Sequence, residues 1–394
     1  MSGFRVLVSL FLLTLGSKWS AATLQAQFEG VAAAVEEGIK LGVYPGAVVM
    51  IGRSDTVLYA RGFGHFTWSR NSPVPDPETT LWDLASLTKV VAATSAAMRL
   101  VDRGGLYLET PVKVYLPQFS GGGKDRVTLR MLLDHTSGLP GSAPLYRGAA
   151  DRDAAIANLW KVELRRPPGA RSEYSDLNAI LLGLVLERVA KVSFPDVIQQ
   201  EVLDPLIMRR TFFAPPASVR RDIAPSLSDR QGPIAGRVSD PNAFAMGGIA
   251  GHAGLFSTGG DLARFAQAWL RGGVLRQGSQ WVTSTTMGQF LTRSSRSDTR
   301  ALGWDSPSLP SGNAMTSFGS LANVDTFGHT GWSGTSIWID PVSDLFVVLL
   351  TNRSYQPKVR QSLTAIRDVR HAVSDAARES FLAQCGGGVV QIRC

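Results

Sequence analysis

The sequence predicts a mixed α/β (α+β) fold, in which an antiparallel sheet flanked by helices carries an inserted all-helical domain. Residues 47–53 and 56–62 read as two strands joined by a turn at Ser54-Asp55, and residues 335–340 and 345–352 form a second strand pair near the other end. Between these pairs, from 84 to about 270, the strongest signals are helical. Sheet elements at both ends with helices between them indicate one sheet layer with a helical insertion.

The remaining elements follow from apolar spacing along the chain. A helix is expected at 24–41, where Phe28, Val31, Val35 and Ile39 recur at helical spacing, and further helices at 84–102, 128–133, 178–189, 194–201, 260–270 and from 358 onward. We therefore expect a sheet domain at 23–80 and 323–384, mainly helical and connecting segments at 81–322, and a tail at 385–394. The Ser/Gly-rich stretch 271–322 has few apolar runs and receives no assignment.

The first 22 residues read as a signal peptide. Arg5 precedes an apolar run at 6–15, and Ser20-Ala21-Ala22 supplies the small residues that suit signal-peptidase cleavage. The run is short for a transmembrane helix, although an uncleaved membrane anchor stays open as an alternative. A periplasmic or secreted protein is therefore expected. In such an oxidising compartment Cys385 and Cys394 can close a disulfide loop across a glycine-rich tail, with two unpaired thiols as the alternative.

The composition limits which partners are expected. The chain has 394 residues, of which 44% are hydrophobic and 18% charged, as in an ordinary globular protein with a large core. Its formal charge of +8 comes with scattered rather than clustered arginines. That balance favours association with an anionic envelope surface, with a solvated basic surface as the plainer alternative. Because no recognition-helix or aromatic-basic motif is present, no nucleic-acid partner is expected.

One helix start carries a candidate nucleophile. Ser86-Leu87-Thr88-Lys89 opens an apolar helix, and residues three apart share a helix face, so the hydroxyl of Ser86 and the amine of Lys89 are expected to meet. Free backbone N–H groups at the helix N-terminus favour a developing anion there. A lysine accepts the serine proton only when it is uncharged, and burial lowers its pKa toward that state. We therefore expect an uncharged amine at Lys89.

Two further motifs support this site. Tyr174-Ser175-Asp176 follows a Pro-Pro-Gly turn and precedes a helix, so Tyr174 can share in the proton transfers of Lys89. Gly328-His329-Thr330-Gly331-Trp332 lies just before the strand predicted at 335–340. Gly331 has no side chain, so a substrate can lie against the strand edge. A backbone N–H there, with that of Ser86, would hold the oxyanion of a tetrahedral intermediate.

The order of these motifs resembles the serine hydrolases related to class C β-lactamases, low-molecular-mass penicillin-binding proteins and their esterase relatives. The segments 132–139, 204–208 and 251–258 agree with that family, so the resemblance covers the chain from about residue 28 to 376. It implies the β-lactamase/transpeptidase-like fold, with the site in a cleft between sheet and helices. It also implies that Ser86 is acylated and that Lys89 accepts its proton. Tyr174 would be a general acid and base, and Trp332 would supply the second oxyanion N–H.

Two positions depart from the β-lactamase pattern. Asp176 stands where the family usually has asparagine, and a carboxylate only accepts hydrogen bonds. His329 replaces the usual lysine, and with an unperturbed pKa of about 6.5 it would become a cation only as the pH falls toward 6. With Thr330 and Gly331, these residues form the expected substrate-contacting set. The lost charge leaves neutral esters easier to accept than carboxylate-bearing substrates.

The sequence therefore predicts an exported serine hydrolase that acts through an acyl-enzyme on small esters or D-alanyl peptides of the cell wall, with β-lactams third. A catalytically inactive binding or scaffold protein on the same fold is the alternative, but it predicts erosion of the nucleophile motif. No metal-ligand or nucleotide-binding motif occurs in the sequence, so neither a metal nor a cofactor is expected. His135 and His252 are expected to be structural hydrogen-bonding groups.

Overall fold

A five-stranded antiparallel sheet forms the centre of the computed structural model, which describes residues 27–308 and 317–386. Its strands are β1 (Gly46–Gly52), β2 (Val57–Gly64), β8 (Phe327–Thr330), β9 (Ser336–Asp340) and β10 (Leu345–Thr351). They lie in the order β2-β1-β10-β9-β8, so strands from the two ends of the chain, β1 and β10, are neighbours. The predicted fold class and both predicted strand pairs are confirmed.

Both faces of the central strands are buried, which explains their unbroken apolar sequence. Every residue of β1 is buried, and its side chains alternate between two cores. Val48 and Met50 face the core shared with the helical layer, whereas Ala47, Val49 and Ile51 face a second core under two long helices. This period of two is that of a β-strand.

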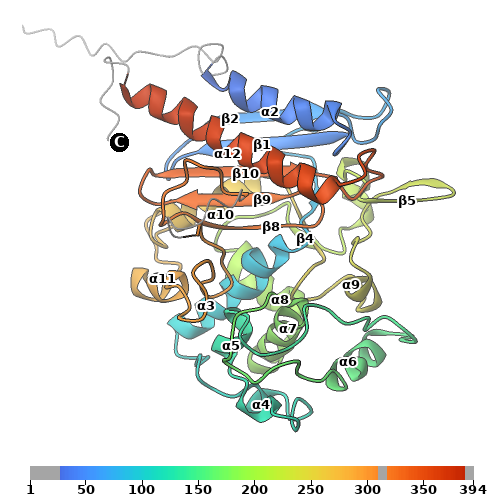
Figure 1. Cartoon of the computed structure of the whole chain (residues 1–394), viewed down its shortest axis with the longest axis vertical. Coiled ribbons are helices and arrows are strands. Elements are labelled where there is room, and N and C mark those ends of the chain that lie inside the picture. Colours follow the sequence, from blue (N-terminus) through green and yellow to red (C-terminus); the bar gives the residue numbers. More distant parts are fainter. Residues whose placement is uncertain (1–26, 309–316, 387–394) are drawn as a thin grey trace, which may run out of the picture.

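Helices cover the sheet on both faces. α2 (Glu29–Lys40) and α12 (Ser362–Gly386) lie side by side on one face (Figure 1). α10 (Gly259–Leu270) packs on the other face, against β1, β9 and β10. A Cβ on Gly259 would lie 2.8 Å from Met50 Cγ, so the missing side chain lets α10 approach β1 closely. The helix predicted at 260–270 is present, but it packs on the sheet rather than within the helical part to which the sequence assigned it.

The helical layer lies beyond β8 and forms the lower half of Figure 1. A π-helix (Lys89–Thr94) continues into α3 (Ser95–Asp102), and α7 (Asp176–Ala190) runs through the main core. The other helices are α4 (Val112–Tyr115), α5 (Leu129–Leu133), α6 (Arg152–Trp160), α8 (Phe194–Ile198), α9 (Pro241–Ala245) and α11 (Ser284–Leu291). The helices predicted at 84–102, 128–133, 178–189 and 194–201 are confirmed, with shifts at their ends.

Short elements complete the helical layer. A second π-helix (Gln199–Leu203) continues α8, and 3-10 turns lie at Lys124–Arg126 and Ala217–Asp222. Two small sheets are formed by β3 (Trp82–Asp83), β7 (Leu255–Ser257) and β4 (Phe212–Phe213), and by β5 (Leu227–Asp229) and β6 (Gly232–Ile234). The first of these sheets matters for the site, because β3 leads directly into Ser86.

The structure differs from the sequence-based expectations at several element boundaries. β8 is a strand at a place where no element was predicted, α11 occupies part of the unassigned stretch 271–322, and α12 begins at Ser362 rather than 358. α12 extends to Gly386, so the backbone of Cys385 belongs to this helix and not to a tail. The expected signal peptide at 1–22 and Cys394 lie outside the described residues. Within 27–308 and 317–386, no helix has the length and apolar character needed to cross a membrane.

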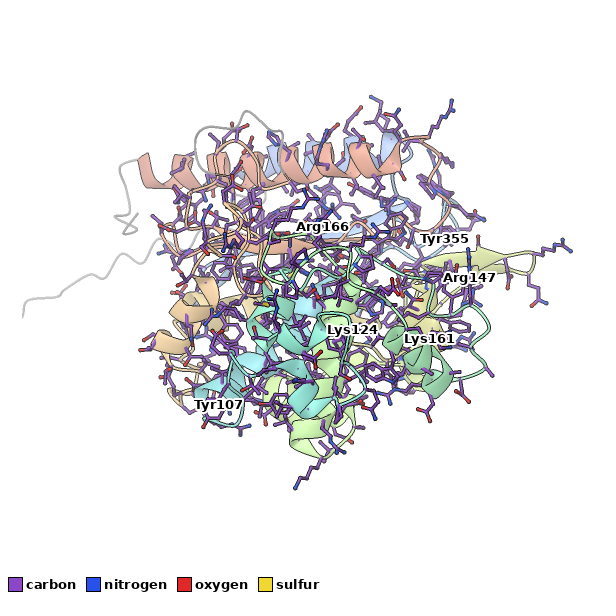
Figure 2. The ribbon with its side chains drawn as sticks, turned by 60° about the horizontal axis from the view of Figure 1, so that its bottom comes forward. Tyr107, Lys124, Arg147, Lys161, Arg166 and Tyr355 are labelled. Atoms are coloured by element: carbon purple, nitrogen blue, oxygen red, sulfur yellow. The ribbon has the colours of Figure 1, made fainter. Side chains whose placement is uncertain are left out.

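Basic residues on the helical side are spread out. Figure 2, which turns the bottom of Figure 1 forward, labels Lys124 near Lys161, with Arg166 apart from this pair, and it also labels Arg147. Lys124 Nζ donates to a backbone carbonyl at 2.8 Å, and Arg166 pairs with Glu173. These four side chains therefore do not form one cationic patch.

Candidate active site

Ser86 stands at a strained turn between β3 and the π-helix. Ala85 has φ +47°, a left-handed conformation that is costly for a residue with a Cβ. Asp83 Oδ1 holds the turn by accepting from Ala85 N at 2.9 Å, and Leu87 N donates to Leu84 O at 3.0 Å. In the described part of the chain, no group accepts from the N–H of Ser86 itself. The turn therefore leaves both the hydroxyl and the backbone N–H of Ser86 available to a substrate.

The hydroxyl of Ser86 opens into a cavity of about 690 Å³ and touches the other two predicted catalytic residues. Lys89 Nζ donates to Ser86 Oγ at 2.8 Å, and the Tyr174 hydroxyl donates to the same oxygen at 2.9 Å. Lys89 is 3% exposed, and its Nζ lies 4.9 Å from the centroid of the Tyr174 ring. The fold thus brings Tyr174 to Ser86 across 88 positions of sequence.

Tyr174 and Asp176 both act on the charge of Lys89. Asp176 Oδ1 lies 2.8 Å from Lys89 Nζ, and the Asp176 side chain is only 22% exposed. Burial favours the uncharged amine, but the negative charges of a Tyr174 phenolate and of Asp176 outweigh burial, so the pKa of Lys89 is raised above its usual value. The expectation of an uncharged amine at Lys89 is therefore wrong. That expectation treated Asp176 only as a hydrogen-bond acceptor for the substrate and did not include the effect of its charge on Lys89. Burial also raises the pKa of Tyr174, although the ammonium of Lys89 opposes that shift.

Replacing Asp176 by asparagine is expected to move the acidic limb of the pH–rate profile to lower pH by about one unit. The charge of Asp176 raises the pKa of both Lys89 and Tyr174, and whichever of them accepts the serine proton must first lose its own. Activity therefore rises with pH, and without the carboxylate it rises earlier. The measurement is kcat/KM for a neutral ester from about pH 6 to about pH 10, where the apparent pKa belongs to the coupled pair.

Glu173→Gln is the matched control for this shift. Glu173 precedes Tyr174 in the chain, but its carboxylate lies 3.4 Å from Arg171 and is not among the groups that line the cavity. Its pH profile should coincide with that of the wild type. A profile that stays in place in Asp176→Asn, or that moves to higher pH, contradicts the charge assigned to Lys89.

The third motif lies along the cavity beside Ser86, at the end of β8. Gly331 touches the nucleophile turn, since a Cβ there would come within 2.5 Å of Leu84 O, and Thr335 Oγ1 donates to the same carbonyl at 3.1 Å. This close approach places the strand edge next to Ser86. Trp332 follows at the rim, 58% exposed, and its N–H has no acceptor among the residues that the structure describes. Two free N–H groups, those of Ser86 and Trp332, are thus available for an oxyanion.

His329 is buried in the cavity wall and uncharged. Its Nδ1 lies 2.8 Å from the carbonyl oxygen of Thr330 and therefore carries the proton, while Nε2 is buried without a described partner. Burial, then the positive charges of Arg300 and Lys89, lower the pKa of His329 well below its usual value. The expectation that His329 becomes a cation near pH 6 is therefore wrong.

Arg300 brings to the cavity the cation that His329 lacks, and the sequence analysis missed it. Its guanidinium lies 5.3 Å from the centroid of the Tyr174 ring and lines the cavity. Asp305 pairs with it at 2.5 Å, and the backbone of Asp305 bonds in both directions to Gly328 in β8. Arg300 lies in the Ser/Gly-rich stretch that lacks periodicity, so no local signal marked it.

The two other histidines near the site are hydrogen-bonding groups, as predicted. His135 Nδ1 bonds to a backbone N–H at 3.2 Å and a side-chain amide at 3.0 Å, both in the segment 175–178. His252 Nε2 lies 2.8 Å from Asp240 Oδ1, and its carbonyl accepts from Lys89 Nζ at 3.3 Å. Over the described ranges, no group of three or more His, Cys, Asp or Glu side chains is placed to hold a metal ion.

Known proteins match most of this chain. Residues 31–371 match the family model described as Beta-lactamase. The chain is 32% identical over 351 residues to a relative in Escherichia coli (strain K12) named "Putative D-alanyl-D-alanine carboxypeptidase", with 80% of each chain covered. It is 31% identical over 359 residues to the "N-acetylmuramyl-L-alanine amidase" of Bacillus subtilis (strain 168), with 82% of this chain and 80% of the relative covered.

Solved structures share the fold. EstCE1, described as a hydrolase with promiscuous acyltransferase activity, matches with a TM-score of 0.70 at 24% identity, over 89% of this chain and 100% of its own. A penicillin-binding protein homologue from Caulobacter crescentus matches with a TM-score of 0.70 at 23% identity, over 90% of this chain and 97% of its own. With the family model and two relatives above 30% identity in agreement, the chain belongs to the β-lactamase family and is a serine hydrolase.

Proposed function

We propose that this chain is an exported serine hydrolase that cleaves D-alanyl peptides of the cell wall through an acyl-enzyme on Ser86. One observation carries the proposal: Ser86 Oγ receives hydrogen bonds from Lys89 Nζ at 2.8 Å and from the Tyr174 hydroxyl at 2.9 Å, at the wall of a cavity. An inactive scaffold on this fold has no need of these three side chains, so their complete set favours a catalyst.

Acylation begins from the form in which the Tyr174 hydroxyl, which donates to Ser86 Oγ at 2.9 Å in this structure, has lost its own proton to solvent, and the phenolate then takes the proton of Ser86. Because the negative charges of the Tyr174 phenolate and of Asp176 keep Lys89 as an ammonium, we assign the proton acceptor to Tyr174, and Lys89 stabilises the phenolate. Ser86 Oγ then attacks the substrate carbonyl, and the N–H groups of Ser86 and Trp332 hold the oxyanion. Tyr174 returns the proton to the leaving amine, the C–N bond breaks, and the acyl group stays on Ser86. A water molecule then attacks the acyl group, and Tyr174 accepts its proton. The bond to Ser86 Oγ breaks, Tyr174 returns the proton to this oxygen, and the acyl group leaves as a carboxylic acid.

Arg300 favours a substrate whose leaving group ends in a carboxylate. Its guanidinium lies over the ring of Tyr174, the residue that protonates the leaving amine, so the two act on the same side of the scissile bond. A guanidinium binds a carboxylate through two parallel hydrogen bonds. A peptide that ends in D-alanine has this carboxylate, and the name of the E. coli relative describes that reaction.

Small esters are the second candidate substrate class. Asp305 lies 2.5 Å from Arg300 and offsets its charge, and the lowered pKa of His329 keeps that residue uncharged. Both observations weaken the attraction for a carboxylate and suit a neutral ester. β-Lactams rank third.

Replacing Arg300 by glutamine is expected to lower the preference for a carboxylate by about tenfold. The preference is the ratio of kcat/KM for a peptide ending in D-Ala-D-Ala to kcat/KM for the same peptide with an amidated C-terminus. Asp305→Asn should raise this ratio, because it frees the guanidinium from its partner. A short-chain nitrophenyl ester and nitrocefin, assayed beside the peptides, rank the three substrate classes.

Arg300→Lys separates charge from shape in this test. It keeps the positive charge, so part of the preference should remain. Hydrolysis of the ester without turnover of either peptide would replace the peptide proposal by the ester one. A ratio that is the same in the wild type, Arg300→Gln and Asp305→Asn removes Arg300 from substrate recognition.

The proposed place of action is the periplasm or the medium. The apolar run at 6–15 after Arg5, followed by Ser20-Ala21-Ala22, supports export, and cell-wall peptides lie outside the cytoplasm. The formal charge of +8 supports association with an anionic envelope surface. Residues 1–26 fused to a reporter that is active only after export should yield active reporter, and an inactive fusion contradicts export.

A further inference from the structure

The cavity has a second charged wall, on a different segment from Arg300. Asp240 lines the cavity just before α9, with a side chain that is 29% exposed. Its Oδ1 already has two partners, Ala243 N and His252 Nε2, both at 2.8 Å. Oδ2 has no donor in the described part of the chain. This oxygen is therefore free to accept a hydrogen bond from a substrate.

Asp240 is held in place and kept charged. His252, which is 1% exposed, fixes the carboxylate from one side, and the N–H of Ala243 fixes it from the first turn of α9. Burial raises the pKa of Asp240, but the hydrogen bond and charge of His252, the N–H of Ala243 and the charge of Lys89 outweigh burial and leave the pKa below its usual value. The carboxylate needs no reorganisation before it binds a cation.

Asp240 and Arg300 serve different parts of a substrate. Arg300 follows α11 in the chain and lies over the Tyr174 ring, where the leaving group receives its proton. Asp240 precedes α9, which lies on the other side of the helical layer from α11 in Figure 1. Ser86 lines the same cavity as both residues. An acyl group on Ser86 that points away from Tyr174 therefore meets the wall that Asp240 belongs to.

We propose that Asp240 Oδ2 binds an ammonium group on the acyl part of the substrate, the part that stays on Ser86. The inference rests on the proposed function and narrows its substrate class to peptides or esters whose acyl group carries a free amine, such as the side chain of a diamino acid. A carboxylate oxygen without a partner forms a charge-assisted hydrogen bond with an ammonium. An alkyl group of equal length gains no such bond, so the site selects between the two.

The test compares nitrophenyl esters in pairs of equal length, from 3-aminopropanoate with butanoate to 6-aminohexanoate with heptanoate. In the wild type, the amino ester of the best-fitting length should have a kcat/KM about tenfold above that of its alkyl partner. Asp240→Asn should abolish this difference. The asparagine keeps an acceptor oxygen for Ala243 N and His252 Nε2, so the change is confined to the charge and to the group at Oδ2.

Asp151→Asn is the control, because it is the same change at the exposed residue that caps α6. Its ratio should equal that of the wild type. A ratio near one in the wild type at every length, or one unchanged in Asp240→Asn, overturns the proposal. Equal loss of both activities also overturns it, since Asp240 is then only structural. Failure of the proposed acyl-enzyme on Ser86 looks different: the wild type hydrolyses neither esters nor peptides, or Ser86→Ala hydrolyses them equally well, and the inference falls with it.

Discussion

Replacement of Ser86 by alanine should lower kcat/KM by at least about 1,000-fold on every substrate that the protein hydrolyses. Ser86 Oγ is the single point at which Lys89 Nζ and the Tyr174 hydroxyl converge, so its loss removes both the nucleophile and the group from which Tyr174 takes a proton. A fluorophosphonate or a fluorescent penicillin should label the wild type at this residue and should not label Ser86→Ala.

The same variant should remain folded. Lys89 keeps its ion pair with Asp176 at 2.8 Å and its hydrogen bond to the carbonyl of His252 at 3.3 Å, so the buried ammonium is not left without partners. Its Tm should lie within a few degrees of the wild type. Ser142→Ala, a change at an exposed serine outside the cavity lining, is the control and should label normally. Equal labelling of Ser86→Ala and the wild type would remove Ser86 as the nucleophile.

The strands that could be predicted from sequence are those whose apolar residues are continuous. β1 and β10 are buried on both faces, and their sequences show it without any knowledge of partners. β8 could not be found in this way, because its four residues, Phe-Gly-His-Thr, include one large apolar side chain. It is a strand because it pairs with β9, with Phe327 opposite Ile339. Pairing between strands is a tertiary property that local composition does not contain.

The residues of the candidate site also divide into those that the sequence could predict and those that it could not. Ser86, Lys89 and Tyr174 could be selected because their motifs have fixed spacing and order, and the structure brings them within hydrogen-bond distance. Arg300 and Asp240 lie in irregular segments, and they reach the cavity only because their loops pack beside β8 and β3. No local pattern distinguishes them from the many other charged residues of the chain.

The charge of Lys89 was predicted wrongly for a related reason. Burial lowers the pKa of a lysine, and the position of Asp176 in its motif places that residue in the site. The sequence does not contain the distance between the two side chains. Once that distance is 2.8 Å, the attraction of the carboxylate, together with that of Tyr174, outweighs the cost of burial, and the same two residues imply an ammonium.

Lys89→Met should lower kcat/KM by about 1,000-fold and also destabilise the fold, and the two effects have separate causes. Activity falls because the phenolate of Tyr174 loses its cation. Stability falls because Asp176, 22% exposed, keeps a carboxylate whose ion pair is gone. Breaking a buried pair costs about 3 to 5 kcal/mol, and the 22% exposure of the Asp176 side chain favours the low end of that range. Chemical denaturation and steady-state kinetics measure the two quantities independently.

The double variant Lys89→Met/Asp176→Leu distinguishes a catalytic lysine from a purely structural one. It removes both charges, so no unpaired carboxylate remains and most of the lost stability should return. Activity should stay as low as in Lys89→Met, because nothing replaces the ammonium beside Tyr174. If the double variant recovered activity together with stability, Lys89 would serve only to hold Asp176. Tyr174 would then act without the ammonium that lies 4.9 Å from its ring, which its raised pKa at a buried position does not favour.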